Sequence, residues 1–530
     1  MYGRLAVVLA LAFGLSACGG GDGMLTGTGG SNGSGSGGGA GGGSGGGTWI
    51  KGVFQPSTNF AALCAAPRSG TSDRSGTSTD ENNWLRSWTN ELYLWYSEVP
   101  DLDPSLYKTP DYFTLLKTSA TTPSGKAKDQ FHFTYKTSDW VALSQSGQSV
   151  GYGTTWSLIS TTPPRRAVIA FVEPSPPAAT AAANLSRGEE IVTVDGVDLV
   201  NDNTQAGIDK LNAGLSPSAN GEQHTFGIKE LNGATRNVTL TATTVTENPV
   251  PTVKVVSSPT GAAVGYVLFN DHIATSELGL VNAITTLKAA SVTDLVLDIR
   301  YNGGGYLDIA AELAFMIAGP TATSGRTFEK VQFNAKHPND DPINGGTITP
   351  TPFHSTSQGF SAGLPKGRAL PTLNLPRVFV LTGSGTCSAS EAIINGLRGV
   401  NVQVIQIGAT TCGKPYGFYP QDNCGTTYFS IEFKGINDQG FGDYADGFAP
   451  ATVPSQPAQL PGCSVADDFT HPLGDIGENR LESALAYRDL GSCVALATLT
   501  TQSVGSRSHA PVEGFVPKSI WQTNRILRRP

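Results

Sequence analysis

Hydrophobic positions recur along the chain in three different patterns, and each pattern predicts a different kind of structure. Between residues 80 and 100 the large apolar side chains follow a helical spacing, which Pro100 ends. These side chains are Trp84, Leu85, Trp88, Leu92, Trp95 and Tyr96. From about residue 148 to 246 short β-type runs are separated by Pro, Gly and Asn, and from about residue 252 strand-like and helix-like runs alternate. An aromatic stripe of this kind is usually a core face, so we assign it no chemistry.

The alternating part of the chain predicts buried strands and helices. VGYVLFN (264–270) and TDLVLDI (293–299) are typical of buried strands, and YLDIAAELAFMIAG is typical of a helix with one apolar side. RVFVLT, ASEAIINGLRGV and VQVIQIG follow as strand, helix and strand. The predicted fold class is α/β multidomain. Its parts are a small helical N-terminal domain (48–147), a β domain (148–247), an α/β domain (248–490) and a polar C-terminal tail (491–530).

The start of the chain has the form of an export signal. Arg4 is followed by an apolar stretch from residue 5 to 15, which is too short to span a membrane permanently. Cys18 directly after small residues resembles the lipobox of bacterial lipoproteins, which implies a lipidated Cys18 at the mature N-terminus. The alternative is an ordinary signal peptide with an incidental cysteine. Gly19 suggests, by the same resemblance, retention in the outer membrane, facing the periplasm or the cell surface.

Residues 19–47 are almost entirely Gly and Ser. Such a segment cannot bury apolar area and is predicted to be a flexible tether. A signal peptide over 1–18, a lipid anchor and this tether together predict a protein of the bacterial cell envelope that reaches the membrane through Cys18.

Charge and cysteine content limit the kinds of partner, metal and cofactor that this chain is expected to bind. The formal net charge is −8 and no basic patch stands out, so no nucleic-acid partner is expected. Six cysteines follow Cys18, an even set that in an exported protein predicts disulfides. Cys412 with Cys424 is the preferred pairing, since their spacing suits a stapled loop. No CxxC or clustered His/Cys pattern predicts a metal site, and no cofactor is expected.

The stretch GTCSASEAIINGLRGV (385–400) contains two candidate nucleophiles, Ser388 and Ser390. Taken alone, Ser388-Ala-Ser-Glu391 fits the capping box that starts a helix, and capping is then the better explanation. Ser390 is predicted to be a residue of the first helical turn. Two further motifs favour chemistry at Ser388.

The first is the glycine run in LDIRYNGGGYLD, from Gly303 to Gly305, between a strand and a helix. Glycines let the backbone approach a ligand closely and point N–H groups at an oxyanion. A plain loop or a phosphate cradle is the alternative, but the GK[ST] ending of a nucleotide-binding loop is missing.

The second is Lys414 in TTCGKPYG, directly after the strand 402–408. Parallel neighbouring strands place their following loops at one edge of the sheet, so Lys414 and Ser388 are expected to meet. A lysine acts as a general base only when neutral, which requires its pKa to fall by about 3 from about 10.4, at a cost of about 4 kcal/mol. Burial among Cys412, Pro415, Tyr416 and Phe418 is the expected cause; an exposed surface lysine is the alternative.

The histidines do not form a triad pattern. Seven are scattered along the chain, and only His272 in FNDHI lies near the predicted core strands. A Ser/Lys pair is therefore preferred over a Ser/His/Asp triad, although both are known ways to activate a hydroxyl.

Part of the β domain resembles a PDZ domain. RGEEIVTVDG matches the glycine and acidic residue before a strand and turn, and GYGTTW stands where that family keeps its carboxylate-binding loop. The resemblance implies that Gly151, Tyr152 and Gly153 hold a peptide whose residues add as a strand to a sheet edge. A generic small β domain is the alternative.

Three stretches in order, LVLDIRYNGGG, VFVLTGSGTCSASEAIINGL and IGATTCGK, resemble the signature blocks of the S41 peptidases, the C-terminal processing or tail-specific proteases. The resemblance implies a ClpP/crotonase-like α/β core, with Ser388 as nucleophile and Lys414 as base. The backbone N–H groups of Gly304 and Ala389 would form the oxyanion hole. The chain departs from that family at Phe418, where many members have a glutamine, and in a Ser-to-Lys spacing one residue longer.

The predicted function is therefore a serine endopeptidase of the cell envelope, with a polypeptide substrate whose C-terminus the PDZ-like domain binds. Two alternatives stay open. One is a peptide- or ligand-binding protein on an S41 scaffold with weakened catalysis, which Phe418 favours. The other is a Ser/Lys esterase or amidase acting on small molecules, which the PDZ-like domain disfavours. The sequence makes no prediction of the oligomeric state.

Overall fold

The computed structural model describes residues 49–174, 177–494 and 525–526. The described residues all belong to one compact unit. The predicted signal peptide, Cys18 and the Gly/Ser tether lie outside the described residues. Within the described ranges, no helix is both long enough and apolar enough to cross a membrane.

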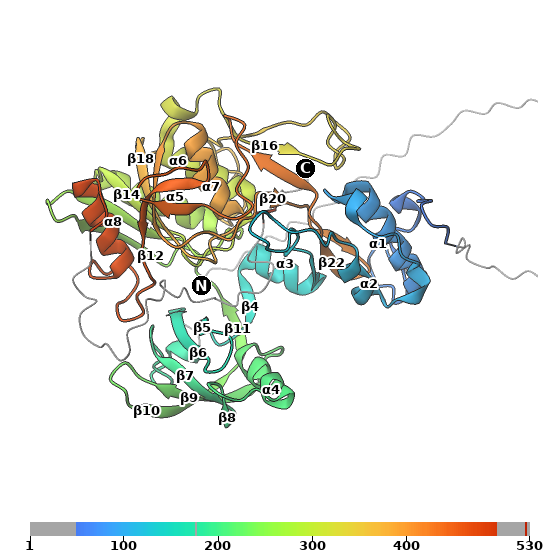
Figure 1. Cartoon of the computed structure of the whole chain (residues 1–530), viewed down its shortest axis with the longest axis horizontal. Coiled ribbons are helices and arrows are strands. Elements are labelled where there is room, and N and C mark those ends of the chain that lie inside the picture. The colour runs from blue at the N-terminus through green and yellow to red at the C-terminus, as the bar shows by residue number, and fades with distance from the viewer. Residues whose placement is uncertain (1–48, 175–176, 495–524, 527–530) are drawn as a thin grey trace, which may run out of the picture. The chain divides into compact units, whose positions relative to one another are not determined.

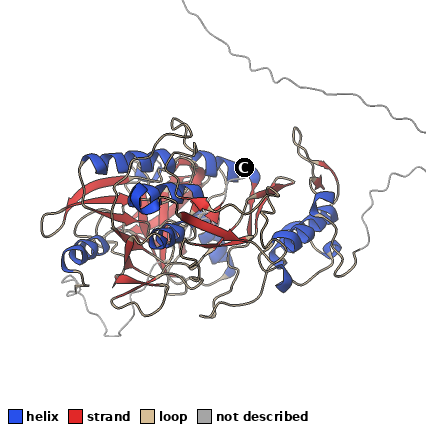
Figure 2. Ribbon diagram, turned by 90° about the horizontal axis from the view of Figure 1, so that it is seen from above, coloured by secondary structure: helices blue, strands red, loops and turns tan. Residues whose placement is uncertain are grey.

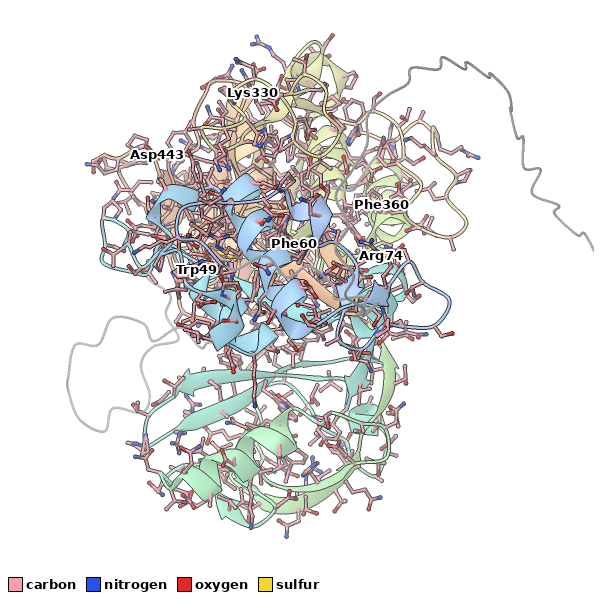
Figure 3. All side chains as sticks on the ribbon, turned by 90° about the vertical axis from the view of Figure 1, so that its right-hand side faces the viewer. Trp49, Phe60, Arg74, Lys330, Phe360 and Asp443 are labelled. Atoms are coloured by element: carbon pink, nitrogen blue, oxygen red, sulfur yellow. A yellow bond between two sulfur atoms is a disulfide. The ribbon has the colours of Figure 1, made fainter. Side chains whose placement is uncertain are left out.

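The helix predicted from the aromatic spacing is present, but it ends at Leu92 and not at Pro100. Trp95 and Tyr96 therefore lie outside it, at the start of a short 3-10 turn. Thr77 and Asp80 form a capping box at the start of the helix. Trp84 then stacks on Trp88, with 5.1 Å between ring centroids. The elements of the N-terminal segment, some of whose side chains appear in Figure 3, are η1 (Ser57–Asn59), β1 (Leu63–Cys64), β2 (Arg74–Ser75), α1 (Ser78–Leu92), η2 (Tyr96–Glu98), η3 (Pro104–Leu106), α2 (Thr109–Leu115), β3 (Phe133–Lys136) and α3 (Thr137–Ser146).

A common sheet and a disulfide join the N-terminal segment to the α/β part of the chain. Strand β3 pairs with β22 (Thr426–Phe429), which in turn pairs with β21 (Gln421–Asn423). A disulfide joins Cys64 to Cys424 at the turn between β21 and β22. Aromatic side chains of the N-terminal segment therefore pack into one core with residues of the later loops. Figure 1 shows β22 beside the N-terminal helices α2 and α3.

The predicted pairing of Cys412 with Cys424 is wrong. The three disulfides are Cys64–Cys424, Cys387–Cys412 and Cys463–Cys493. Spacing alone favoured the shorter loop, but strands β20 (Tyr416–Gly417) and β21 carry the chain away from Cys412 before it reaches Cys424. Tertiary proximity, and not sequence separation, decides which cysteines pair.

Residues 148–246 form the predicted β domain around its own core, which includes Trp156, Ile169 and Phe226. Its antiparallel sheet has the order β10-β9-β7-β6-β5, with β8 paired to β7. The elements are β5 (Thr154–Ser160), β6 (Arg166–Val172), η4 (Pro177–Ala179), β7 (Glu190–Val194), β8 (Val197–Asp198), α4 (Gln205–Leu215), β9 (Gln223–Lys229) and β10 (Thr235–Thr241). A separate two-stranded ribbon of β4 (Gln148–Gly151) and β11 (Thr243–Thr246) carries the chain into and out of the domain.

The α/β part is built on a seven-stranded sheet of order β12-β13-β14-β18-β19-β25-β24. Only β12 runs antiparallel to its neighbour. Helices lie on both sides of the sheet (Figure 2). Alternate strand residues pack against α5, α6 and α7 on one face and against α8 on the other. The elements are β12 (Thr252–Ser257), β13 (Ala263–Leu268), α5 (Ser276–Ala289), β14 (Asp294–Asp298), α6 (Leu307–Thr323), β18 (Arg377–Thr382), α7 (Ala389–Gly399), β19 (Gln403–Gly408), β24 (Ala449–Ala451), β25 (Gln459–Ser464) and α8 (Asn479–Leu490).

Two smaller sheets border the carboxyl edge of this sheet. One has the order β17-β16-β23-β20, from β16 (Thr327–Gln332), β17 (Thr351–Pro352) and β23 (Phe433–Ile436) together with β20. In the other, β15 (Gly305–Tyr306) pairs in parallel with β26 (Arg525–Ile526). A strand from the predicted tail thus lies beside the glycine loop, which the sequence did not indicate.

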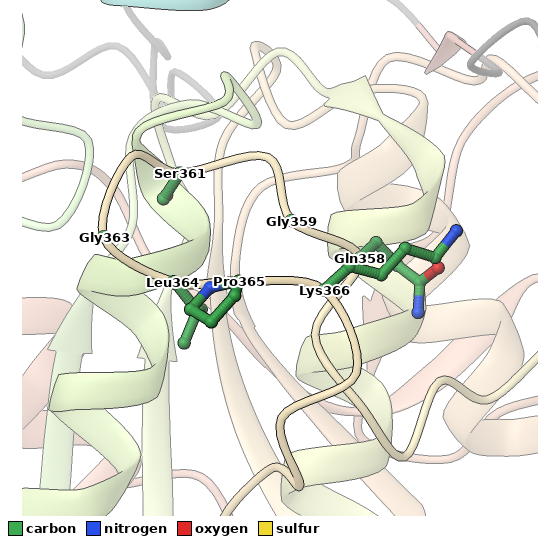
Figure 4. Close-up of a pocket in the computed structure, with 7 residues that line it drawn as sticks. All are labelled: Gln358, Gly359, Ser361, Gly363, Leu364, Pro365 and Lys366. Atoms are coloured by element: carbon green, nitrogen blue, oxygen red, sulfur yellow. The ribbon is translucent and has the colours of Figure 1, made fainter. Parts of the chain in front are cut away.

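A buried pair of glutamates anchors the loop that follows β17. Glu277 on α5 and Glu312 on α6 both accept a hydrogen bond from the Gln358 N–H, at 2.7 Å each. Glu277 also accepts two further backbone N–H groups of the loop, at 2.8 Å each. The loop, drawn in Figure 4, borders a cavity of about 540 Å³. Burial, together with the negative charge of Glu277, raises the pKa of Glu312 to about 10.

We expect Glu312→Gln to stabilise the protein above neutral pH. The unfolded Glu312 releases its proton near its ordinary pKa, whereas the folded protein keeps that proton until about pH 10. Stability is therefore lost as pH rises between these values, by at most about 1.4 kcal/mol per pH unit. Glutamine keeps a donor toward Glu277 and cannot ionise. Melting temperatures from pH 5 to 9 should fall less steeply for Glu312→Gln than for the parent, and the exposed-site control Glu482→Gln should follow the parent. Parallel curves for all three proteins would contradict the prediction.

Candidate active site

Three loops leave the carboxyl edge of the central sheet side by side. Strands β14, β18 and β19 are parallel neighbours, so the segments after them emerge at the same edge. These segments are residues 299–305, 383–388 and 409–415. The first holds the glycine run, the second ends at Ser388 and the third holds Lys414. The predicted meeting of the three motifs at one edge is confirmed.

Hydrogen bonds tie the three loops together. The Cys387 N–H donates to the Asn302 carbonyl at 3.1 Å, and the Cys412 N–H donates to the Thr386 carbonyl at 3.0 Å. The Thr386 hydroxyl donates to the Ile299 carbonyl at 2.8 Å. Each loop is therefore bonded to the middle one, which carries Ser388.

Ser388 has a strained backbone at the turn into α7. Its φ is 59° and its ψ is −110°, a conformation that a residue with a side chain rarely adopts. The residue is fully buried. A strained residue between a strand and a helix is the arrangement that α/β hydrolases use for a nucleophile. A serine that only caps the helix does not need this strained backbone conformation.

Glu391 fixes the turn of Ser388 relative to the loop of Lys414. Its carboxylate accepts the Ser388 N–H at 2.8 Å, which confirms the glutamate half of the predicted capping box. It also accepts the Thr411 hydroxyl at 2.5 Å, the Gly413 N–H at 2.9 Å and the Lys414 N–H at 2.8 Å. Burial raises the pKa of Glu391, and these donated hydrogen bonds oppose that rise. One side chain thus holds the backbone of both candidate catalytic residues.

The disulfide Cys387–Cys412 reinforces the same connection. It joins the residue before Ser388 to the second residue before Lys414. Cys387, Glu391 and Cys412 are also the set of described side chains that lie close enough together to hold a metal ion. Because both sulfur atoms are used in the disulfide, this cluster does not provide metal ligands in the oxidised protein.

Lys414 is fully buried, as its apolar neighbours in the sequence predicted. Its Nζ lies 4.5 Å from the centroid of the Phe131 ring and 4.6 Å from that of the Phe418 ring. Phe418, the departure from the expected glutamine, therefore contacts the lysine itself. Phe131 comes from the N-terminal segment, and sequence reasoning missed it because no motif surrounds it.

The glycine loop is shaped by Asn302. The Asn302 side chain accepts the Gly304 N–H at 3.0 Å and donates to the Phe269 carbonyl at 3.0 Å. Gly304 and Gly305 have φ values of 107° and 135°, and a Cβ on Gly305 would lie 2.4 Å from the His272 carbonyl oxygen. The Gly304 N–H is therefore engaged within its own loop in this state, and its predicted oxyanion role requires that bond to break.

The structure also places the remaining predicted residues near Ser388. Ala389 is the first residue of α7 and is fully buried. Ser390 lies in the first turn, as predicted, and its hydroxyl donates to the Asn302 carbonyl at 3.0 Å. His272 is fully buried, with Nδ1 2.9 Å from Asn302 Oδ1. Ser390 and His272 thus hold the asparagine that shapes the glycine loop.

A buried ionic network lies beneath the glycine loop, which sequence reasoning did not assign. The Arg300 guanidinium donates to Asp298 at 2.9 Å, to Asp467 at 2.8 Å and to Glu478 at 2.7 and 2.9 Å. Arg187 of the β domain donates to Asp467 at 2.7 Å. Burial alone would raise the pKa of Asp467, but the charges of Arg187 and Arg300 hold it well below its usual range. The network fixes the strand end that leads into the loop and connects it to the β domain.

The predicted peptide-binding residues Gly151, Tyr152 and Gly153 line a cleft of about 650 Å³. The Tyr152 hydroxyl donates to the Gly214 carbonyl at the end of α4, at 3.0 Å. The opposite wall includes Asn270 and Asp271. Since Asp271 directly precedes His272, this cleft reaches the support of the glycine loop. Peptide binding by these three residues stays a prediction.

The part of the chain that contains these three loops matches a known family. Residues 263–418 match the sequence pattern of peptidase family S41. A carboxyl-terminal-processing protease from a Picosynechococcus species is 27% identical over 173 residues, which is 32% of this chain. The match spans only 39% of that curated relative.

Solved structures share the fold. A structure from Bacteroides fragilis, assigned to the S41 proteases, is 22% identical with a TM-score of 0.54, covering 77% of this chain and 97% of that one. A photosystem II D1 C-terminal processing protease is 20% identical with a TM-score of 0.40, covering 73% of this chain and 94% of that one. The first of these shows that the mixed α/β multidomain fold resembles an S41 protease structure.

Proposed function

We propose that this chain is a serine endopeptidase of the S41 type with a Ser388/Lys414 dyad. The match of residues 263–418 to the pattern of peptidase family S41, and the similarity to a carboxyl-terminal-processing protease, support this proposal. The observation that carries this proposal is the double attachment of the two residues. Glu391 accepts the backbone N–H of both, and the disulfide Cys387–Cys412 joins their loops. A binding protein without catalysis has no need of this arrangement.

The geometry supports acyl transfer. The proposed step needs Lys414 as a neutral amine, which takes the proton of the Ser388 hydroxyl. Burial of Lys414 disfavours its charged form, whereas the Phe131 and Phe418 rings beside Nζ favour it. Ser388 Oγ then attacks the peptide carbonyl, the amine leaves with a proton from Lys414, and water releases the acyl group. The N–H of Ala389, at the N-terminus of α7, is placed to stabilise the negative charge on the carbonyl oxygen.

The direct test is covalent labelling of Ser388. A fluorophosphonate probe should modify the parent chain and not Ser388→Ala, and mass spectrometry should place the adduct on the peptide that holds Ser388. The parent should also cleave an unfolded protein. Cleavage that persists in Ser388→Ala would show that Ser388 is not the nucleophile and would contradict the proposed dyad. A weakened binding protein, which Phe418 favours, would bind peptides and show neither labelling nor cleavage.

The same proposal places the enzyme in the cell envelope, anchored through lipid on Cys18. The three disulfides support an oxidising compartment, and the lipobox-like start supports the anchor. In a bacterial host, radiolabelled palmitate should enter the parent chain and not Cys18→Ala, while membrane fractionation should recover the parent with the membranes. Equal labelling of both chains would contradict the anchor.

A further inference from the structure

Three side chains around the turn of Ser388 carry the donor atoms of a metal site. They are Cys387, Glu391 and Cys412, whose two sulfur atoms and one carboxylate oxygen lie within 4.8 Å of one another. In the oxidised protein the two sulfur atoms are bonded to each other. The cluster can therefore bind a metal ion only after this disulfide has been reduced.

The distances fit a tetrahedral ion with two thiolate ligands and one carboxylate ligand. Cys412 Sγ lies 3.4 Å from Glu391 Oε2. With a Zn–S distance of about 2.3 Å and a Zn–O distance of about 2.1 Å, a thiolate and a carboxylate oxygen on one Zn²⁺ are about 3.6 Å apart, and two thiolates are about 3.8 Å apart. The Cα atoms of Cys387 and Cys412 are 5.2 Å apart, so rotation of the side chains can bring the freed sulfur atoms to that separation. The fourth position stays open for water.

The surroundings favour anionic sulfur ligands and a soft cation. Cys387 directly precedes Ser388, at the N-terminus of α7, where the helix carries a positive partial charge that stabilises a thiolate. Cys387 and Glu391 are buried, so a cation bound between them must have its charge balanced by its own ligands. Two thiolates and one carboxylate provide that balance, and thiolates select Zn²⁺ over Mg²⁺ and Ca²⁺.

Reduction can open the site from its exposed side, because Cys412 is partly exposed. A thiolate of a small dithiol attacks Cys412 Sγ, forms a mixed disulfide with it, and releases Cys387, which takes up a proton. The second thiol of the reductant then displaces Cys412, so the reductant becomes a disulfide and the chain gains two thiols. Binding of Zn²⁺ replaces the two thiol protons, which pass to water.

We propose that the reduced protein binds one Zn²⁺ ion between Cys387, Cys412 and Glu391, and that this ion inactivates Ser388. The inactivation follows from competition for Glu391. Its Oε2 accepts the N–H groups of Ser388 and Lys414, at 2.8 Å each, which uses both lone pairs of that oxygen. An ion bound to Oε2 displaces at least one of these N–H groups and releases its loop. The inactivation rests on the proposed peptidase function, whereas the metal binding does not.

The binding is tested by alkylation of cysteines, mapped by mass spectrometry. The full-length chain is reduced with a phosphine and treated with iodoacetamide, with and without Zn²⁺. We expect Zn²⁺ to slow the alkylation of Cys387 and Cys412 at least about 10-fold, since a thiolate that holds a metal ion is not free to attack. The cysteines of the other two disulfides are internal controls and should react at nearly unchanged rates.

Equal protection of all six disulfide cysteines, or protection of none, overturns the site. A chain that unfolds on reduction gives the same result, because it does not hold the three ligands together. Far-UV circular dichroism of the reduced chain shows whether it stays folded.

The carboxylate ligand is tested with Glu391→Gln, which keeps the size of the side chain and removes its charge. The Zn²⁺ concentration that half-protects Cys412 should rise at least about 10-fold, a loss typical of a weakened metal site. Glu391→Asp keeps the charge on a shorter side chain and should lie between the parent and Glu391→Gln. The exposed-site control Glu482→Gln should follow the parent. The same half-protection in all four chains overturns the role of Glu391.

The inactivation is tested on an unfolded protein substrate. After reduction, Zn²⁺ should lower the cleavage rate of the parent at least about 10-fold further, since displaced reacting groups cost this much, and a chelator should restore the rate. Reduced Cys387→Ala/Cys412→Ala lacks the same disulfide and should not respond to Zn²⁺. Equal inhibition of both chains overturns the inactivation and leaves the binding. Absence of cleavage in every chain counts against the peptidase proposal, and the alkylation data still decide the binding.

Discussion

Lys414→Ala and Ser388→Ala are each expected to lower the rate of peptide hydrolysis by about 10³-fold or more. In the proposed mechanism, Ser388 supplies the atom that attacks the carbonyl, and Lys414 supplies the amine that takes its proton. Neither role has a substitute in the loops described, because His272 Nδ1 lies against Asn302 and Glu391 binds backbone N–H groups. Initial rates on an unfolded protein or a fluorogenic peptide measure the loss, and far-UV circular dichroism shows whether each variant folds.

Lys414→Arg tests more directly than Lys414→Ala whether residue 414 must accept a proton. Arginine is also a long basic side chain that can lie against the Phe131 and Phe418 rings, but it stays positively charged in proteins and therefore cannot accept a proton. We expect Lys414→Arg to be as inactive as Lys414→Ala, and the double variant Ser388→Ala/Lys414→Ala to be no worse than either single one. Lys434→Ala, which removes an ion pair with the exposed Asp443, is the matched control and should keep full activity. Substantial activity in Lys414→Arg would rule out the lysine as base.

Removing the Cys387–Cys412 disulfide is expected to lower kcat by about 10- to 100-fold with little change in KM. The bond joins the residue before the nucleophile to the loop of the base, and small displacements of reacting groups cost this much in rate. Hydrogen bonds through Glu391 still hold the loops together, so the protein should fold and bind its substrate. Steady-state kinetics of Cys387→Ala/Cys412→Ala separate kcat from KM.

The other disulfides are the matched controls. Cys463–Cys493 lies in the core on the α8 face of the sheet, and Cys64–Cys424 ties the N-terminal segment. Their double alanine variants should lose stability and keep kcat. A kcat that falls equally in all three pairs would show a general loss of structure, and an unchanged kcat in Cys387→Ala/Cys412→Ala would contradict the positioning role.

Much of the candidate site could be predicted because its residues follow strands. Each of the three motifs stands at the end of a buried apolar run, and parallel strands bring such ends to one edge. Ser388, Lys414 and the glycine run were therefore placed together before their contacts were known. The first-turn position of Ser390 followed equally from the helical pattern after it.

What surrounds the lysine could not be predicted. Phe131 lies far from Lys414 in the sequence, in a segment without any motif, and reaches it only because β3 joins the sheet with β22. Phe418 was noticed as a departure from an expected glutamine, but only the fold shows that its ring contacts the amine. The disulfide partner of Cys412 was mispredicted for the same reason.

The sequence by itself determined the local structure and the chemical parts of this protein. Periodic apolar positions specify helices and strands because neighbouring residues must share a face, and the strand ends specify where reactive side chains emerge. The tertiary structure alone decided the partners across the chain: Phe131 beside Lys414, Cys387 with Cys412, Arg187 with Asp467, and Arg525 beside Gly305. These contacts depend on how distant segments pack against each other. The distance between two residues in the folded chain has no simple relation to their separation in the sequence.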